Sequence, residues 1–163
     1  MLITHASIDD SAEILDLQKL AYQSEAALYD DFSLPPLTET IEDWESHFTS
    51  RVVLKAVDQG RIIGSVRAYQ DGKTCHIGRL IVHPNDQRQG IGTQLMNQIE
   101  ASFPAAEHFE LFTGHRSAIA LHLYERLGYK VFKQEPVHDR LILVFLEKTR
   151  KVESMAILEA KEK

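Results

Sequence analysis

The first fifty residues carry apolar positions with a helical spacing. One helix face is formed at intervals of 3, 4, 3 and 4 by Ile14, Leu17, Ala21, Ser24 and Leu28. The Asp-x-x-Glu sequence at residues 10–13 resembles a capping box and predicts where this helix begins. Two prolines within residues 29–38 argue against helix there and predict an ordered loop. A second short helix is then expected, ending near Phe48.

The middle of the chain changes to short apolar runs separated by glycine turns. The runs cover residues 51–58, 61–69 and 74–82, and the turns contain Gly60 and Gly72. The second turn is Asp-Gly, which between two strand-like runs is a strong hairpin signal. We therefore predict three successive strands joined as hairpins.

Helical and strand-like segments alternate in the second half. The predicted elements are a helix over 91–103, a strand over 108–114, a helix over 117–128 and strands over 129–135 and 140–148. The first of these helices should face inward with Ile91, Leu95, Met96 and Ile99. Gly128 is the residue type that caps a helix in the left-handed conformation. The element order α-α-β-β-β-α-β-α-β-β predicts an α/β (α+β) fold with one mixed sheet and helices on both faces.

Length and composition fit one domain. The chain has 163 residues, of which 44% are hydrophobic and 26% charged. We assign a single domain to residues 1–148 and a charged, mildly amphipathic C-terminal tail to residues 149–163. The single cysteine, Cys75, excludes an internal disulfide and favours a reducing compartment. Without a basic leader or a long apolar run, we expect a cytoplasmic protein that has no membrane partner.

The charge is unevenly distributed along the chain. Residues 1–50 contain eleven acidic residues and one lysine, a net charge of −10, whereas residues 51–163 carry +4. The acidic part is suited to a cationic partner and the basic part to an anion, although solvated helix faces explain the same pattern. The overall charge of −6, and the lack of a basic stripe interleaved with aromatic residues, argue against nucleic acid.

Residues 87–92, Gln-Arg-Gln-Gly-Ile-Gly, lie between a predicted strand and a predicted helix. A helix N-terminus has unsatisfied N–H groups and a partial positive charge, and glycines let its backbone approach a phosphate. Arg88 adds a full charge. The turn can cradle a pyrophosphate, and the alternative is a plain strand-to-helix turn. The glycine spacing matches neither a nucleoside-triphosphatase loop nor a complete dinucleotide fingerprint.

Two motifs together resemble the Gcn5-related N-acetyltransferase (GNAT) family. Gln87-x-x-Gly90-x-Gly92 is similar to the family's [RQ]-x-x-G-x-[GA] acetyl-CoA loop. SAIALHLYERLGYKVF, residues 117–132, is similar to the second signature, with an alanine, a helical tyrosine and a closing Leu-Gly-Tyr in place. The resemblance covers residues 2–148. It implies a central, mostly antiparallel sheet that splays apart between the fourth and fifth strands, which are residues 74–82 and 108–113 here.

The resemblance also implies where acetyl-CoA, as a co-substrate, would bind. Backbone amides of the loop would hold the pyrophosphate, and the fourth strand would pair with the pantetheine arm. The cofactor-binding residues are then Leu80, Ile81, Val82, Gln87, Arg88, Gln89, Gly90, Ile91, Gly92, Thr93, Ser117, Ala120 and Tyr124. Ser117 stands where the family often has asparagine, so its contact with the cofactor is the least supported of these.

Acetyl transfer to an amine needs a proton acceptor, an oxyanion donor and a proton donor to the leaving thiolate. By resemblance, Tyr124 is the general acid, with core packing as the alternative. A backbone amide near Val82 is the expected oxyanion donor. Members often have a glutamate eleven residues before the motif's glutamine, and His76 stands there. A histidine is a competent base at neutral pH. By strand alternation it shares a face with Leu80 and Val82. The alternatives are ordered water and the carboxylates or polar groups Glu25, Tyr29 and Asp31 of the first helix and its loop.

The first helix and its loop line the acceptor site in this family, which selects Glu25, Tyr29 and Asp31 as substrate-binding residues. We expect an N-acetyltransferase that acts by direct attack on a small-molecule or peptide amine, and the acidic N-terminal part favours a cationic acceptor. The last strands and the tail make a homodimer plausible. The histidine spacings predict no metal. The alternative function is a non-catalytic acyl-CoA-binding sensor or regulatory module.

Overall fold

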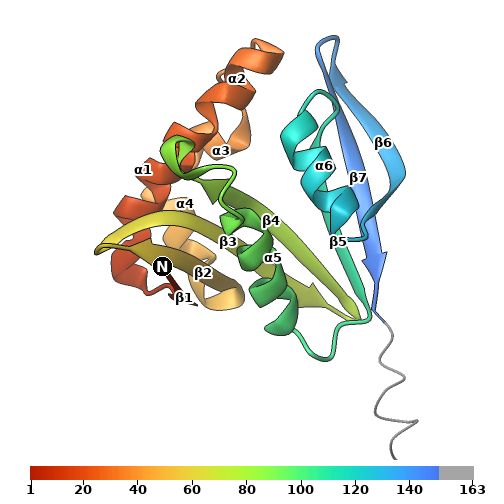
Figure 1. The fold of residues 1–163 in the computed structure, drawn as a ribbon. Helices are drawn as coiled ribbons and strands as arrows, with labels where there is room; N and C mark the ends of the chain where they lie inside the picture. The colour runs from red at the N-terminus through yellow and green to blue at the C-terminus, as the bar shows by residue number, and fades with distance from the viewer. Residues whose placement is uncertain (151–163) are drawn as a thin grey trace, which may run out of the picture.

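The computed structural model describes residues 1–150, which form one seven-stranded sheet in the order β1-β2-β3-β4-β5-β7-β6 (Figure 1). All neighbouring strands are antiparallel except β4 and β5. The predicted mixed, mostly antiparallel sheet is therefore confirmed. The strands are β1 (Leu2–His5), β2 (Val52–Asp58), β3 (Arg61–Asp71), β4 (Thr74–Val82), β5 (His108–Gly114), β6 (Lys130–His138) and β7 (Leu141–Thr149).

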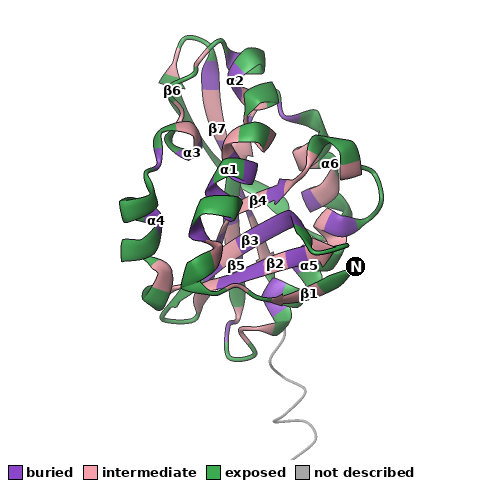
Figure 2. Ribbon diagram, turned by 90° about the vertical axis from the view of Figure 1, so that its left-hand side faces the viewer, coloured by how far each residue is buried: buried purple, intermediate pink, exposed green. Residues whose placement is uncertain are grey.

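Helices cover both faces of the sheet, as predicted (Figure 1). The helices are α1 (Ser11–Ala21), α2 (Gln23–Tyr29), α3 (Pro35–Thr38), α4 (Ile41–Ser46), α5 (Ile91–Ala101) and α6 (Ala118–Arg126), with 3₁₀ turns η1 (Ile8–Asp10), η2 (Phe48–Ser50) and η3 (Pro84–Asp86). A smaller apolar cluster joins α1 and α4 to the sheet, and a larger cluster lies under α5 and α6. Figure 2 shows buried residues concentrated in the central strands between these layers.

The predicted inner face of α5 is correct, because Ile91, Leu95, Met96 and Ile99 are all buried. Gly128 has a φ of 96° and follows α6, so its predicted role as a left-handed cap residue is also confirmed.

Three local predictions for the N-terminal region are wrong. Helix α1 begins at Ser11, as the pattern at residues 10–13 predicted, but the capping box itself does not form. Asp10 instead accepts hydrogen bonds from Ser7 N and Lys55 Nζ, and Glu13 accepts one from Ile62 N. The helix is interrupted at Tyr22, which turns the following helix so that Ala26 and Tyr29 are buried while Ser24 and Leu28 are exposed. Residues 35–38 form one helical turn, since prolines are tolerated in a first turn whose N–H groups need no partner. The predicted order also lacks β1.

The end of the domain extends past the predicted boundary at residue 148. Thr149 belongs to β7, and the Arg150 guanidinium donates hydrogen bonds to the carbonyls of Glu100, Phe103 and Ala106. The rest of the predicted tail, residues 151–163, lies outside the described residues, and the homodimer stays a prediction. No helix within residues 1–150 is long and apolar enough to cross a membrane.

A bulge in β4 reverses which side chains face each layer. Arg67 pairs with Gly78 but Ser65 pairs with Ile81, and Arg79 between them has a φ of 51°. Before the bulge Ile77 packs in the cluster under α5, whereas after it Ile81 packs in the cluster under α1. A one-residue irregularity moves every later side chain to the opposite face.

The parallel pairing of β4 with β5 is short. It joins residues 74–76 to residues 108–110 and goes no further. Beyond it the two strands separate, so the sheet forms a V that is open toward α2 (Figure 1). The predicted splay between the fourth and fifth strands is confirmed.

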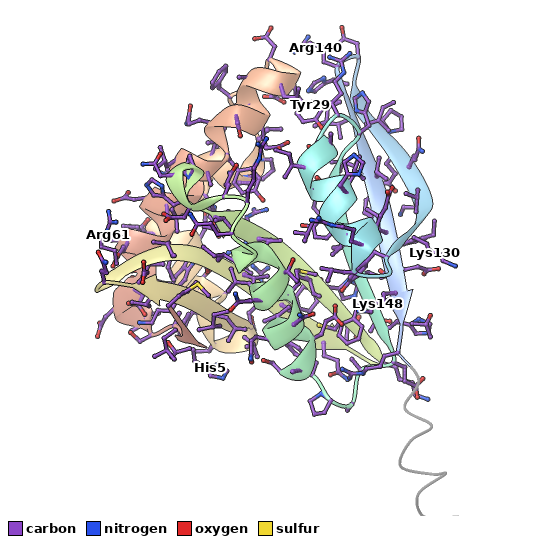
Figure 3. All side chains as sticks on the ribbon, in the orientation of Figure 1. His5, Tyr29, Arg61, Lys130, Arg140 and Lys148 are labelled. Carbon is purple, nitrogen blue, oxygen red and sulfur yellow. The ribbon has the colours of Figure 1, made fainter. Side chains whose placement is uncertain are left out.

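The open end of the V is crossed by side chains from α2. The Tyr29 hydroxyl lies 2.8 Å from Ser117 Oγ and accepts a hydrogen bond from Arg116 N at 2.9 Å. Arg140, in the turn between β6 and β7, donates to the Tyr29 carbonyl at 3.1 Å, and both residues lie at this end in Figure 3. We call Tyr29, Ser117 and Arg140 the α2 bridge, because they join α2 to the second half of the sheet.

Gly114 allows the α2 bridge to form, because a Cβ there would overlap the Tyr29 hydroxyl and its ring carbon Cζ. We predict that Gly114→Ala lowers the free energy of unfolding by about 1–3 kcal/mol through this overlap. A double-mutant cycle with Tyr29→Ala, measured by urea unfolding, should show most of that loss as coupling between the two positions. An equal cost of Gly114→Ala in both backgrounds would show that the overlap is not its cause.

Candidate active site

A cavity of about 920 Å³ occupies the opening between β4 and β5. It is bordered by α1 and α2, the two separated strands, the loop before α5, the exposed turns of α6 and the β6–β7 hairpin. Its lining includes Leu80 and Val82 from β4, Leu111 and Thr113 from β5, and Tyr124 from α6. The cavity therefore runs through the sheet and connects the two layers of helices.

The walls of this cavity include two strand edges that lack a strand partner. Residues 77–82 of β4 pair with β3 on one side only, and residues 111–113 of β5 pair with β7 on one side only. Backbone N–H and C=O groups on such edges need hydrogen-bond partners. The opening is thus suited to an extended ligand that has amide groups, which can add to the edges as a strand would.

The mouth of the cavity is formed by residues 87–93 at the start of α5. The first backbone hydrogen bond of helix α5 is donated by Gln94 N to Gly90 O. The N–H groups before Gln94 therefore have no acceptor within the helix. Arg88 and Gly90 have φ angles of 64° and 80°, which turn the backbone sharply before the helix. Unpaired N–H groups, a helix N-terminus and an arginine are together suited to an anion, so residues 87–93 form a candidate anion site. Of the predicted loop residues, Gln89 alone does not line the cavity.

Tyr124 lies on α6 one turn after Ala120, and both line the cavity, as predicted. The Tyr124 side chain is 7% exposed, and its ring packs edge-on against Tyr129 at 6.0 Å between centroids. Burial raises the pKa of Tyr124, with smaller contributions from Tyr22 and Glu25. The hydroxyl therefore keeps its proton at neutral pH and can donate a hydrogen bond into the cavity.

Ser117 does not face the cavity where a cofactor would bind. It is 3% exposed and donates from Oγ to Glu25 Oε2 at 2.5 Å, in addition to its contact with Tyr29. Serine is too short to reach past these partners, so the structure makes it part of the α2 bridge. Ser117 is not among the residues that line the cavity, and its contact with the cofactor stays a prediction.

The three predicted substrate-binding residues, Glu25, Tyr29 and Asp31, all line the cavity on the α2 side. Asp31 accepts hydrogen bonds from Ser33 N and Oγ and lies 3.0 Å from His138 Nε2. These hydrogen bonds, led by those from Ser33, lower the pKa of Asp31 to about 2. Asp31 is therefore a poor proton acceptor at neutral pH. It can still attract a cation.

His76 is not brought to the cavity. It precedes the β4 bulge, so it points to the face opposite Leu80 and Val82, and the predicted shared face is wrong. Its ring stacks on Tyr69 at 5.0 Å, and Nδ1 lies 3.8 Å from Glu110 Oε2. His76 sits where β4 and β5 are still paired, below the opening. This position suits a half-exposed structural residue.

Apolar residues from the second half of the sheet also line the cavity and were not predicted. Phe112, Val137 and Leu143 form this wall. Phe112 is 52% exposed and Val137 54%, so an alternating strand pattern gave no reason to separate them from ordinary solvent-facing positions.

Cys75 is fully buried, and burial raises the pKa of its thiol to about 12, which makes it an unreactive core residue. Within residues 1–150 no cluster of three metal-ligating side chains occurs.

Comparison with known proteins identifies the family. A model described as "Acetyltransferase (GNAT) family" matches residues 12–129. The chain belongs to this family. The match includes α1, the split strands and the loop before α5, and it ends at Tyr129 after α6.

Individual relatives of this GNAT protein are distant. It is 28% identical over 153 residues to the UPF0157 protein YqkA of Bacillus subtilis, covering 93% of this chain but 44% of that protein. It is 27% identical over 132 residues to the N-terminal acetyltransferase B complex catalytic subunit NAT3 of Saccharomyces cerevisiae, covering 75% of this chain and 68% of that protein. A PaiA N-acetyltransferase from Thermoplasma acidophilum, solved in complex with coenzyme A, has the same fold at 16% identity, with a TM-score of 0.74 over 92% of this chain and 100% of that one.

Gly90 and Gly60 offer a matched test of the anion site. Both have a positive φ and open space where a Cβ would lie, but Gly60 lies in the β2–β3 turn. Each glycine-to-alanine change should cost about 1–2 kcal/mol of stability through left-handed strain. Only Gly90→Ala should also weaken coenzyme A binding, by about tenfold, because it displaces N–H donors. Equal affinities of the two variants by calorimetric titration would contradict a phosphate site at this loop.

Proposed function

We propose that this protein is an acetyl-CoA-dependent N-acetyltransferase in which an amine attacks the bound thioester directly. The supporting observation is that one cavity connects the anion site at residues 87–93 to the Tyr124 hydroxyl through the unpaired edges of β4 and β5. Coenzyme A has the matching chemistry: a pyrophosphate, an extended arm with two amide groups, and a terminal thioester. Membership of the acetyltransferase family agrees with this assignment.

The reaction divides between the two sides of the opening. The amine nitrogen forms a bond with the thioester carbonyl carbon, and the carbon–sulfur bond breaks. A backbone N–H on the free edge of β4 would donate to the carbonyl oxygen as it gains negative charge. Tyr124, on the α6 side, would supply a proton to the thiolate. Glu25, on the α2 side, would accept the proton that the amine loses, directly or through one water molecule.

Tyr124→Phe tests the role of the hydroxyl as a proton donor. We predict that kcat falls about 100-fold because the thiolate leaves without a proton, while the KM for acetyl-CoA changes little. Tyr129→Phe is the matched control, since Tyr129 is also buried but donates its hydroxyl hydrogen bond to Glu100, away from the cavity. Steady-state kinetics that show the same kcat for Tyr124→Phe and wild type would remove Tyr124 as the acid.

Glu25→Gln and His76→Gln separate the two candidate bases. Glutamine at position 25 still accepts the Ser117 hydrogen bond but takes up no proton, so kcat/KM should fall about 100-fold at neutral pH. His76→Gln should stay within about twofold of wild type, because His76 lies outside the cavity. The measurement is a pH–rate profile of each variant. Loss of the fall in rate at acidic pH, where a general base becomes protonated, in His76→Gln alone would reverse the assignment.

Release of free coenzyme A thiol from acetyl-CoA tests the proposed function itself. The assay should use a panel of amines grouped by charge and size, including polyamines, aminoglycosides and peptides that have a free amino terminus. Turnover with a subset of these amines is expected. Tight acetyl-CoA binding without turnover of any amine, measured by titration calorimetry, would instead favour the non-catalytic sensor.

A further inference from the structure

A second, polar cavity of about 300 Å³ lies beside the active-site cavity. It opens between α3, α4 and the face of β3 and β4 that α1 covers, and its charged side chains are Arg51, Arg67, Arg79, Glu39 and Asp43. We call it the arginine pocket. Pro35 and Arg79 line both cavities, so the arginine pocket adjoins the α2 side of the active site, where the amine would enter.

Glu39 is the only carboxylate that the arginines of this pocket contact among the described residues. It is 8% exposed, and it accepts hydrogen bonds from Arg67 Nη1 at 2.9 Å and Arg79 Nε at 3.3 Å. Gln18 Nε2 also donates to it, at 3.0 Å. One buried carboxylate is therefore shared by two guanidinium groups and an amide, which together use three of its roughly four acceptor sites.

The remaining charges leave an excess of positive charge. Asp43 accepts a hydrogen bond from Thr40 N in the cap of α4. The Arg51 guanidinium lies 5.7 Å from the centre of the Tyr69 ring and has no hydrogen-bonded acceptor within residues 1–150. Arg67 and Arg79 each use only one guanidinium nitrogen, although each group has several donors. Three arginines thus face two carboxylates, and several N–H donors in the pocket are available to an added acceptor.

The β4 bulge places Arg79 at the edge of the arginine pocket. Arg79 has a φ of 51°, which is unfavourable for a residue other than glycine, and this conformation places its side chain beside Glu39 at the border of the two cavities. Anchoring α3 to the sheet requires Glu39, Gln18 and Arg67. It gives no reason for a third arginine at position 51, whose guanidinium contacts the Tyr69 ring but no hydrogen-bond acceptor among residues 1–150.

We propose that the arginine pocket binds a carboxylate of the acceptor, so that the substrate is an amine that also bears a carboxylate, such as an amino acid or an acidic peptide. This inference rests on the proposed function and deepens it. Arginine presents paired donors that match the two oxygens of a carboxylate. The excess of one positive charge matches a carboxylate monoanion better than a phosphate dianion. Glu25 and Asp31, across Arg79 and Pro35, would face the ammonium end of the same molecule.

Matched acceptors that differ in one group test this substrate class. In the first pair an ω-amino acid is compared with its amide. In the second pair the dipeptides Ala-Glu and Ala-Gln, both amidated at the C-terminus, differ only in the side-chain carboxylate. Wild type should prefer the carboxylate member in kcat/KM by about tenfold, the worth of one charge-assisted hydrogen bond. Arg51→Gln should abolish this preference. Arg61→Gln, an exposed arginine at the far β2–β3 hairpin in Figure 3, should keep it. Equal use of both members by wild type would overturn the proposal.

A titration with glutarate tests the anion site independently of acetyl transfer. Glutarate has two carboxylates and no amine, so its binding requires no reaction. Calorimetry in the presence of saturating coenzyme A should detect binding to wild type and Arg61→Gln, and binding about tenfold weaker to Arg51→Gln. If glutarate binds wild type more tightly than Arg51→Gln but no amine reacts, the result counts against the proposed function and leaves the arginine pocket standing. Glutarate affinities that are equal in Arg51→Gln and wild type, or no binding to wild type, would overturn the arginine pocket as a carboxylate site.

Discussion

The short pairing between β4 and β5 is the constraint on which the rest of the molecule depends. Three residue pairs hold the strands together at one end, and beyond them the sheet opens into a cavity with unpaired backbone on both walls. Exposed strand edges are a liability unless something pairs with them. Here α5 and α6 enclose the opening from one side and α2 from the other, so that an extended ligand is the natural partner of the edges. The anion site at residues 87–93 lies at the mouth of the same opening.

The bulge at Arg79 decides which β4 side chains face each layer of helices. It lets Leu80 and Val82 face the cluster under α5 and α6, and it leaves His76 on the other face, stacked against Tyr69. It also places the Arg79 side chain at the border between the active-site cavity and the arginine pocket. One backbone irregularity thus lies between the proposed cofactor side of the molecule and the proposed acceptor side.

Features that depend on neighbouring residues could be read from the sequence, and those that depend on distant pairing could not. The glycine turn before α5, the buried face of α5 and the Gly128 cap follow local patterns. The face of His76 was predicted wrongly because the bulge arises from pairing with β3. Ser117 was assigned to the cofactor by resemblance, and its hydrogen-bond partners Tyr29 and Glu25 could not be read from the sequence because they lie 88 and 92 residues away along the chain. The strand β1 was missed because its four residues show little burial contrast.

Amide-resolved hydrogen exchange, measured with and without acetyl-CoA, is the decisive test of the opening between β4 and β5 as the ligand site. Unpaired strand edges should exchange quickly in the free protein and slow down when an extended ligand pairs with them. We predict added protection on β4 at residues 77–82 and at the loop over residues 87–93, with no change in the hairpin turn at Gly60. Protection at the loop alone, or at neither segment, would contradict the proposal that this opening holds acetyl-CoA.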